Sequence, residues 1–167
     1  MVEVTNAANV GLNGNEFVLS SEFQILLVDD SNADASIFEV ALAEASTRVK
    51  LYWVASGEEA LEFVHGKGRF EGILPPKIMV LDLNMPGATG FDVLKAVRAD
   101  PKSRHLPVIV FSTSSAQKDV NMAYALGANA YFAKPMSLET YISKVRIIIQ
   151  HWLDLALLPA SEAGQPE

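Results

Sequence analysis

Short apolar segments alternate with amphipathic segments along most of the chain. Five apolar segments are rich in Val, Ile and Leu without clean alternation of apolar and polar positions: 24–28, 50–54, 78–81, 108–111 and 130–132. Segments of this length and composition are typical of strands buried on both faces of a parallel sheet. The pattern therefore predicts five parallel strands.

The first two intervening segments carry helix start signals. Ser31 with Asp34 is a variant capping signal, and Ser56 with Glu59 forms a capping box. The second of these helices is expected to stop near Gly66, where a long connection rich in Gly and Pro begins.

Three further helices complete the pattern. The third is expected to end before Pro101, the fourth near Gly127, and the last follows a Ser137 cap. The last helix has an apolar stripe that we expect in the core: Leu138, Ile142, Val145, Ile149 and Trp152. Five strands that alternate with five helices predict an α/β fold, a doubly wound five-stranded parallel sheet flanked by five helices.

The 167 residues, of which 50% are hydrophobic, are enough for one core. Residues 1–22 are rich in Asn and Gly and are expected to form a flexible N-terminal arm, followed by one domain over 23–153 and a C-terminal extension over 154–167. Apolar residues continue into this extension: Trp152, Leu155, Leu157 and Leu158. Packing against the same domain is the simpler explanation, and an exposed patch would instead indicate a homodimer.

Composition excludes several classes of protein. A net charge of −7 argues against a nucleic-acid partner, and the absence of cysteine excludes disulfides, thiolate catalysis and Cys-based zinc sites. No segment approaches the roughly 18 apolar residues that a membrane helix needs, so we expect a cytoplasmic protein without a membrane partner. Only about fifteen residues follow Trp152 in this sequence, so we expect no DNA-binding output domain.

Polar residues follow four of the five predicted strands. Asp29 and Asp30 follow the first, Asp82 the third and Ser112 the fourth, and Lys134 comes just after the fifth. These strand ends lie at one edge of a parallel sheet, so the side chains are expected to converge. Three carboxylates so close together repel one another unless a cation neutralises them, and hard oxygen ligands favour Mg²⁺.

Such a pocket can support phosphoryl transfer. Asp82 can act as a carboxylate nucleophile that forms an aspartyl phosphate. Lys134 can stabilise charge on the transferring phosphoryl oxygens, and Ser112 can donate its hydroxyl to one of them.

These motifs, in this order, resemble the receiver domains of two-component response regulators. The motifs are Val28-Asp29-Asp30, Asp82-Leu83-Asn84-Met85-Pro86-Gly87 with Gly90, Ser112 after an apolar strand, and Lys134-Pro135. The resemblance covers roughly residues 23–152 and implies a flavodoxin-like receiver fold.

The resemblance also implies residue roles. Asp82 would be the phosphoacceptor, and Asp30, Asp82 and the backbone carbonyl of Asn84 would ligate Mg²⁺, with Asp29 holding a metal-bound water. Ser112 and Lys134 would bind the phosphoryl group. Ser112 would also act in switching, together with an aromatic residue at Tyr131 that turns inward on activation.

A further similarity points to a sub-family. The 66–76 connection, the 124–129 stretch and the Trp152-Leu153 ending resemble single-domain receivers associated with bacterial phytochromes. The implied partner is a sensor histidine kinase, with a bacterial phytochrome as candidate. The protein would then be a phosphoacceptor regulator that catalyses only its own phosphorylation and dephosphorylation, and would signal by docking or phosphotransfer.

Two other functions share parts of this pattern. A phosphohydrolase of the haloacid dehalogenase type needs a second Asp two residues after its nucleophile, where this chain has Asn84. A flavodoxin-like cofactor carrier needs a phosphate loop after the first strand, where Asp29 and Asp30 would repel a flavin phosphate. Taken singly, Lys134 also fits a solvated turn, and Tyr131 fits ordinary strand packing.

Overall fold

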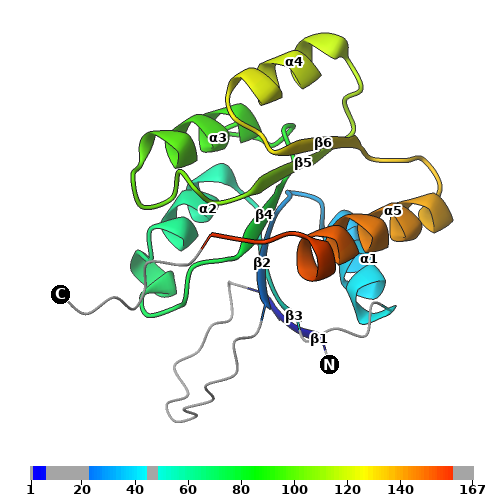
Figure 1. Cartoon of the computed structure of the whole chain (residues 1–167), viewed down its shortest axis with the longest axis horizontal. Helices are drawn as coiled ribbons and strands as arrows, with labels where there is room; N and C mark the ends of the chain where they lie inside the picture. The colour runs from blue at the N-terminus through cyan, green and yellow to red at the C-terminus, as the bar shows by residue number, and fades with distance from the viewer. Residues whose placement is uncertain (1, 7–22, 45–48, 160–167) are drawn as a thin grey trace.

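A single sheet of six parallel strands organises the chain (Figure 1). The computed structural model describes residues 2–6, 23–44 and 49–159. The strand order is β1-β3-β2-β4-β5-β6. The strands are β1 (Val2–Asn6), β2 (Phe23–Val28), β3 (Val49–Val54), β4 (Ile78–Leu81), β5 (Val108–Ser112) and β6 (Ala130–Ala133). The five strands predicted from the sequence are confirmed as β2 to β6.

Helices cover both faces of the sheet. They are α1 (Asn32–Glu44), α2 (Gly57–Val64), α3 (Gly90–Ala99), α4 (Gln117–Ala125) and α5 (Leu138–Gln150), with short helical turns η2 (Gly68–Phe70) and η3 (His151–Leu155). Figure 1 shows α1 and α5 on one face and α2, α3 and α4 on the other. This arrangement confirms the doubly wound fold.

The apolar side chains of the strands belong to two hydrophobic clusters, one on each face of the sheet. In β2, Leu26 and Val28 join the cluster under α2 and α3, whereas Ile25 and Leu27 join the cluster under α1 and α5. Helices bury both faces of the sheet, which is why the strands lack apolar–polar alternation.

The predicted core stripe of α5 needs one correction. Val145 and Ile149 are fully buried as predicted, but the side chain of Leu138 is 58% exposed. Leu138 is the first residue of α5, directly after the Ser137 cap, whereas Tyr141 one turn later is buried and packs edge-on against Phe111.

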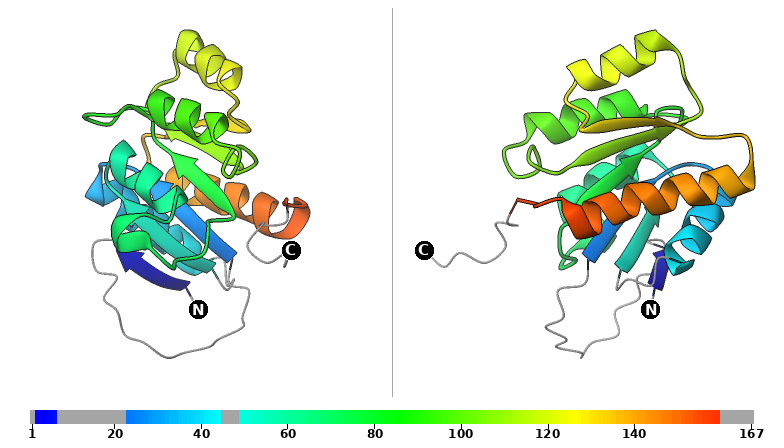
Figure 2. Two further views of the ribbon diagram at one scale, coloured as in Figure 1. Left: turned by 90° about the vertical axis from the view of Figure 1, so that its left-hand side faces the viewer. Right: turned by 45° about the vertical axis from the view of Figure 1, so that its right-hand side comes forward.

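The sheet also has a strand where the sequence indicated an arm. Val2–Asn6 pair in parallel with Val49–Trp53 of β3, so part of the N-terminal stretch forms an edge strand (Figure 2). The arm interpretation is wrong for these five residues, and positions 7–22 lie outside the described residues.

The described part of the C-terminal extension packs on its own domain at one residue. Leu158 contacts the cluster under α1 and α5, as do Trp152 and Leu153 at the end of the domain, while Leu155 and Leu157 are exposed. A homodimer through this extension stays a prediction. Among the described residues, no helix has the length and apolar character needed to cross a bilayer.

Candidate functional site

The backbone at the carboxyl edge of the sheet is held by hydrogen bonds that continue past the strand ends. The backbone amide of Asp82 donates to the carbonyl of Val28 at 2.9 Å, and the backbone amide of Lys134 donates to the backbone carbonyl of Ser112 at 2.7 Å. The amide of Asp29 donates to the last carbonyl of β3 at 3.1 Å. The sheet itself therefore fixes the positions of three predicted site residues.

Three carboxylates meet at this edge, as the sequence predicted. Oxygens of Asp29, Asp30 and Asp82 all lie within 4.8 Å of one another. Asp29 and Asp82 are buried and Asp30 is exposed, so the cluster opens to solvent on one side. A set of hard oxygen donors with excess negative charge and solvent access suits a divalent cation that keeps several of its waters.

Lys134 provides the positive charge within the cluster. Its ammonium nitrogen lies 2.7 Å from Oδ2 of Asp29, 2.7 Å from Oδ2 of Asp34 and 2.9 Å from Oδ2 of Asp82. An ammonium has three hydrogens, so each carboxylate can accept one. The Lys134 side chain is 4% exposed, which excludes the solvated-turn interpretation.

The environment shifts the pKa of two of these groups in the same direction. Burial raises the pKa of Asp29 to about 6, against the opposing effect of the neighbouring Lys134 ammonium. Burial by itself would lower the pKa of Lys134, but the three carboxylates outweigh it and raise that pKa above its usual value. Lys134 therefore stays charged across the physiological range.

Asn84 connects the loop after β4 with the end of β5. Its backbone amide donates to Oδ1 of Asp82 at 3.2 Å. Its side-chain Nδ2 lies 3.3 Å from the hydroxyls of both Ser112 and Thr113. Ser112 is fully buried, and Asn84 is thus hydrogen-bonded to both Asp82 and Ser112. Metal ligation by the Asn84 carbonyl stays a prediction.

Tyr131 lies on β6, the strand that pairs with β5. Its hydroxyl donates to the backbone carbonyl of Ser114 at 2.8 Å. Ser114 in turn donates from its amide to Ser112 Oγ at 3.5 Å, at the limit of a hydrogen bond. Tyr131 thus contacts the loop after β5, which places it where a switch residue can sense that loop.

Comparisons with known proteins agree with this geometry. A family model described as "Response regulator receiver domain" matches residues 25–146. The chain belongs to the response regulator receiver family. The resemblance noted from the sequence motifs is thereby confirmed.

Relatives of this receiver domain include phytochrome response regulators. The chain is 33% identical over 137 residues to response regulator Rcp1 of Synechocystis sp., with 82% of this chain and 93% of Rcp1 covered. The structure of the phosphorylated cyanobacterial phytochrome response regulator RcpA matches with a TM-score of 0.81 at 32% identity, covering 84% of this chain and all of RcpA. The Mn²⁺-bound structure of Rcp1 matches with a TM-score of 0.78 at 33% identity, covering 82% and 99% of the two chains.

Gly90 allows the acceptor loop of the receiver domain to lie close to α3. A Cβ at this position would meet the carbonyl oxygen of Asp82 and would lie 2.7 Å from the Cα of Leu83. Thr89, the residue before it, caps α3 through a capping box with Asp92. The glycine is therefore needed for the packing of this helix start against the backbone of the predicted phosphoacceptor.

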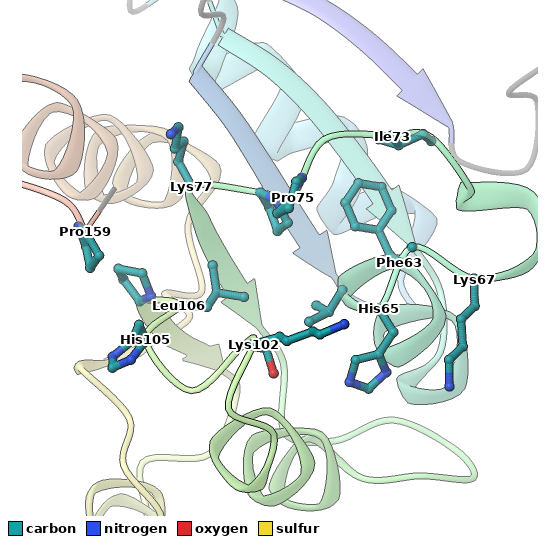
Figure 3. Close-up of a pocket in the computed structure, with 15 residues that line it drawn as sticks. Phe63, His65, Lys67, Ile73, Pro75, Lys77, Lys102, His105, Leu106 and Pro159 are labelled. Atoms are coloured by element: carbon teal, nitrogen blue, oxygen red, sulfur yellow. The ribbon is translucent and has the colours of Figure 1, made fainter. Parts of the chain in front are cut away.

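A cavity of about 550 Å³ lies elsewhere on the receiver domain, at the opposite edge of the sheet (Figure 3). Lys77 and Pro107, which directly precede β4 and β5, contribute to its lining, together with His65 and Lys102. None of the carboxylates of the acidic cluster lines it. This cavity is thus separate from the candidate phosphorylation site.

Two residues of the site were missed by the sequence interpretation. Asp34 was assigned only a capping role, yet its carboxylate contacts Lys134. Trp53 was not considered, yet its Nε1 donates to the backbone carbonyl of Asp29 at 2.8 Å. An indole so close to the acidic cluster gives the protein an internal fluorescent reporter.

Proposed function

We propose that this receiver domain accepts a phosphoryl group on Asp82 from a sensor histidine kinase and passes the signal on by docking or phosphotransfer. The observation that carries the proposal is the position of Asp82, which lies in a cluster of carboxylates with the Lys134 ammonium 2.9 Å from its own oxygen. A nucleophilic carboxylate beside an acidic metal site and a fixed cation has the parts that phosphoryl transfer requires.

The transfer step exchanges one bond to phosphorus for another. A carboxylate oxygen of Asp82 forms an O–P bond while the P–N bond to the donor histidine breaks. The bonding pair returns to the imidazole nitrogen, which takes up a proton from solvent. In the dephosphorylation half of the cycle, water attacks phosphorus, the O–P bond to Asp82 breaks with its bonding pair returning to the carboxylate, and inorganic phosphate leaves.

Asp29, Asp30 and Asp82 would hold Mg²⁺, with the backbone carbonyl of Asn84 as a further proposed ligand. Bound Mg²⁺ would supply neutralisation of charge on the phosphoryl oxygens. Lys134 would move from the Asp82 carboxylate to a phosphoryl oxygen, because both acceptors lie on the same side chain after transfer.

The switch would begin at Ser112. Its hydroxyl would donate to a phosphoryl oxygen and draw the loop after β5 toward Asp82. Because the Tyr131 hydroxyl bonds to the Ser114 carbonyl of the same loop, loop movement would reorient that ring. Exposed apolar side chains near this face, Met122 and Tyr124 of α4, would then be presented differently to a partner.

The proposed phosphodonor is a sensor histidine kinase of the phytochrome type. Its support is the similarity to RcpA, whose structure is described as that of a phosphorylated phytochrome response regulator. In this role the protein is a cytoplasmic regulator and catalyses only its own phosphorylation and dephosphorylation.

Beryllofluoride binding tests the proposal, because beryllofluoride mimics a phosphoryl group on a carboxylate. Trp53 fluorescence, in a Trp152→Phe background, should change saturably when beryllofluoride is added with Mg²⁺. The same titration on an added Asp82→Asn substitution should give no change. A saturable change of equal size in the Asp82→Asn protein would contradict the proposed acceptor.

A further inference from the structure

Lys134 has a third carboxylate partner that lies outside the acidic cluster. Asp34 Oδ2 is 2.7 Å from the Lys134 nitrogen, as close as Asp29 and closer than Asp82. Its side chain is 24% exposed, whereas those of the other two partners are 2% and 6% exposed. Asp34 is not among the three carboxylates whose oxygens all lie within 4.8 Å of one another.

The start of α1 leaves the Asp34 carboxylate available for this contact. In a full capping box, the acid three residues after the cap would accept the backbone amide of the cap residue. Here the Ser31 hydroxyl accepts the Asp34 amide at 3.2 Å, but the Ser31 amide donates to Oδ1 of Asp29 at 3.0 Å. Asp29 thus takes the place of the second capping partner, and Asp34 can turn to Lys134.

The three partners of Lys134 differ in what phosphorylation demands of them. Asp29 and Asp82 belong to the carboxylate group that suits a divalent cation, and Asp82 is also the proposed acceptor. Both must give up or share their contact with Lys134 when the site is loaded. Asp34 belongs neither to the group that suits a cation nor to the reacting atoms, so its ion pair with Lys134 can persist through phosphorylation and dephosphorylation.

We propose that Asp34 is a positioning residue that anchors the Lys134 ammonium beside Asp82 while the other two carboxylates are engaged. The proposal rests on the function proposed above. The anchored ammonium keeps one hydrogen on Asp34 and directs the others toward the incoming phosphoryl oxygens. Without the anchor, the flexible lysine stem would lose its alignment when Asp29 and Asp82 turn away.

Asp34→Asn is the main test, because it removes the charge while the backbone amide still reaches Ser31. At saturating Mg²⁺, the rate of phosphorylation by acetyl phosphate should fall about tenfold, because a neutral amide oxygen accepts from the ammonium more weakly than a carboxylate does. Asp34→Glu should recover at least part of that rate. Glu39→Gln, an exposed position on the same helix, makes the same change in net charge and should keep the wild-type rate.

A spectroscopic readout separates anchoring from a general structural effect. In the Mg²⁺-loaded wild type, the ammonium protons of Lys134 should be protected from exchange and visible by ¹⁵N NMR. They should be lost in Asp34→Asn and kept in Glu39→Gln, with urea unfolding used to verify that all variants are folded.

The outcomes separate this inference from the proposed function. No phosphorylation of the wild type would overturn the function itself. Normal phosphorylation of the wild type with an unchanged rate in Asp34→Asn, or an unchanged Lys134 ammonium signal in that variant, would overturn the anchoring role alone.

Discussion

The ammonium nitrogen of Lys134 lies 2.9 Å from Oδ2 of Asp82, although 52 residues separate them in the sequence. This one cation is in contact with the carboxylates of Asp29, Asp34 and Asp82, and the carboxylate of Asp30 lies beside those of Asp29 and Asp82. The ionised site therefore carries a net excess of negative charge. Binding of a divalent cation relieves this repulsion, which couples metal binding to stability.

Removal of Lys134 should destabilise the metal-free protein and leave it dependent on Mg²⁺. Lys134→Met leaves buried Asp29 and Asp82 without their cation, a loss of about 3–5 kcal/mol for a buried pair that is broken on one side. Urea unfolding with and without Mg²⁺ measures the change. Mg²⁺ should restore a large part of the lost stability.

Lys144→Met provides the matched control for this substitution. Lys144 is half-buried and donates to the carbonyl of Ala133 at 2.8 Å, with no carboxylate partner in the described contacts. Its loss should cost about 1 kcal/mol, and Mg²⁺ should change the stability of this variant no more than that of the wild type. If Mg²⁺ raised the free energy of unfolding of both variants equally, the carboxylates around Lys134 would not be the source of the Mg²⁺ dependence.

Asp29 should give the metal-free protein a pH dependence of a definite sign. Its pKa of about 6 in the folded state lies above the unfolded value of about 3.9. As pH rises between these values, the unfolded chain ionises first, so the folded state loses on the order of 2 kcal/mol of stability in that window. The loss is absent below the unfolded pKa and complete above pH 6.

The difference between wild type and Asp29→Asn isolates this contribution, because other carboxyl groups titrate in the same range. Urea midpoints across the window should show wild type losing stability relative to Asp29→Asn as pH rises. Two curves that stay parallel would show that burial of Asp29 has no such cost. Added Mg²⁺ should remove the difference above pH 6, where Asp29 is ionised.

Gly90→Ala should impair both stability and phosphorylation. The added Cβ would collide with the backbone of Asp82 and Leu83, and such overpacking costs about 1–3 kcal/mol. The acceptor loop must shift to relieve the collision, so the phosphorylation rate should fall even at temperatures where the variant is fully folded.

Gly66→Ala separates the two effects of the Gly90 substitution. Gly66 has a φ of 59°, which strains any other residue, but a Cβ there would meet nothing within 4 Å. This variant should lose stability and keep the phosphorylation rate. A Gly90→Ala protein that is phosphorylated at the wild-type rate would show that the close approach to Asp82 is unimportant.

The sequence was informative about the site because a parallel sheet converts strand order into proximity. Asp29, Asp82 and Lys134 each follow a short apolar run, and the fold brings such positions to one edge regardless of their separation in sequence. The same rule predicted the neighbourhood of Ser112, but not the Asn84 amide that bridges to it. Side-chain bridges depend on rotamers that the pattern of residues does not specify.

Asp34 and the strand β1 were missed for different reasons. An acid three residues after Ser31 has a local explanation as a cap, and the competing partner of Ser31, the Asp29 carboxylate, becomes visible only in three dimensions. Val2–Asn6 alternates Val with the polar residues Glu3 and Thr5 as an edge strand does, but the Asn- and Gly-rich stretch after it dominated the interpretation. The predicted burial of Leu138 in α5 was wrong because periodicity does not show which turns of a helix lie over the sheet.

The mass of the intact protein after incubation with acetyl phosphate tests the central claim most directly. Wild type and Asp82→Asn are each measured with Mg²⁺ and with a chelator, and beryllofluoride binding checks for rapid hydrolysis. The account predicts one phosphoryl adduct that appears only with both Mg²⁺ and Asp82. An adduct of the same yield on Asp82→Asn, or neither adduct nor beryllofluoride binding on wild type, would contradict it.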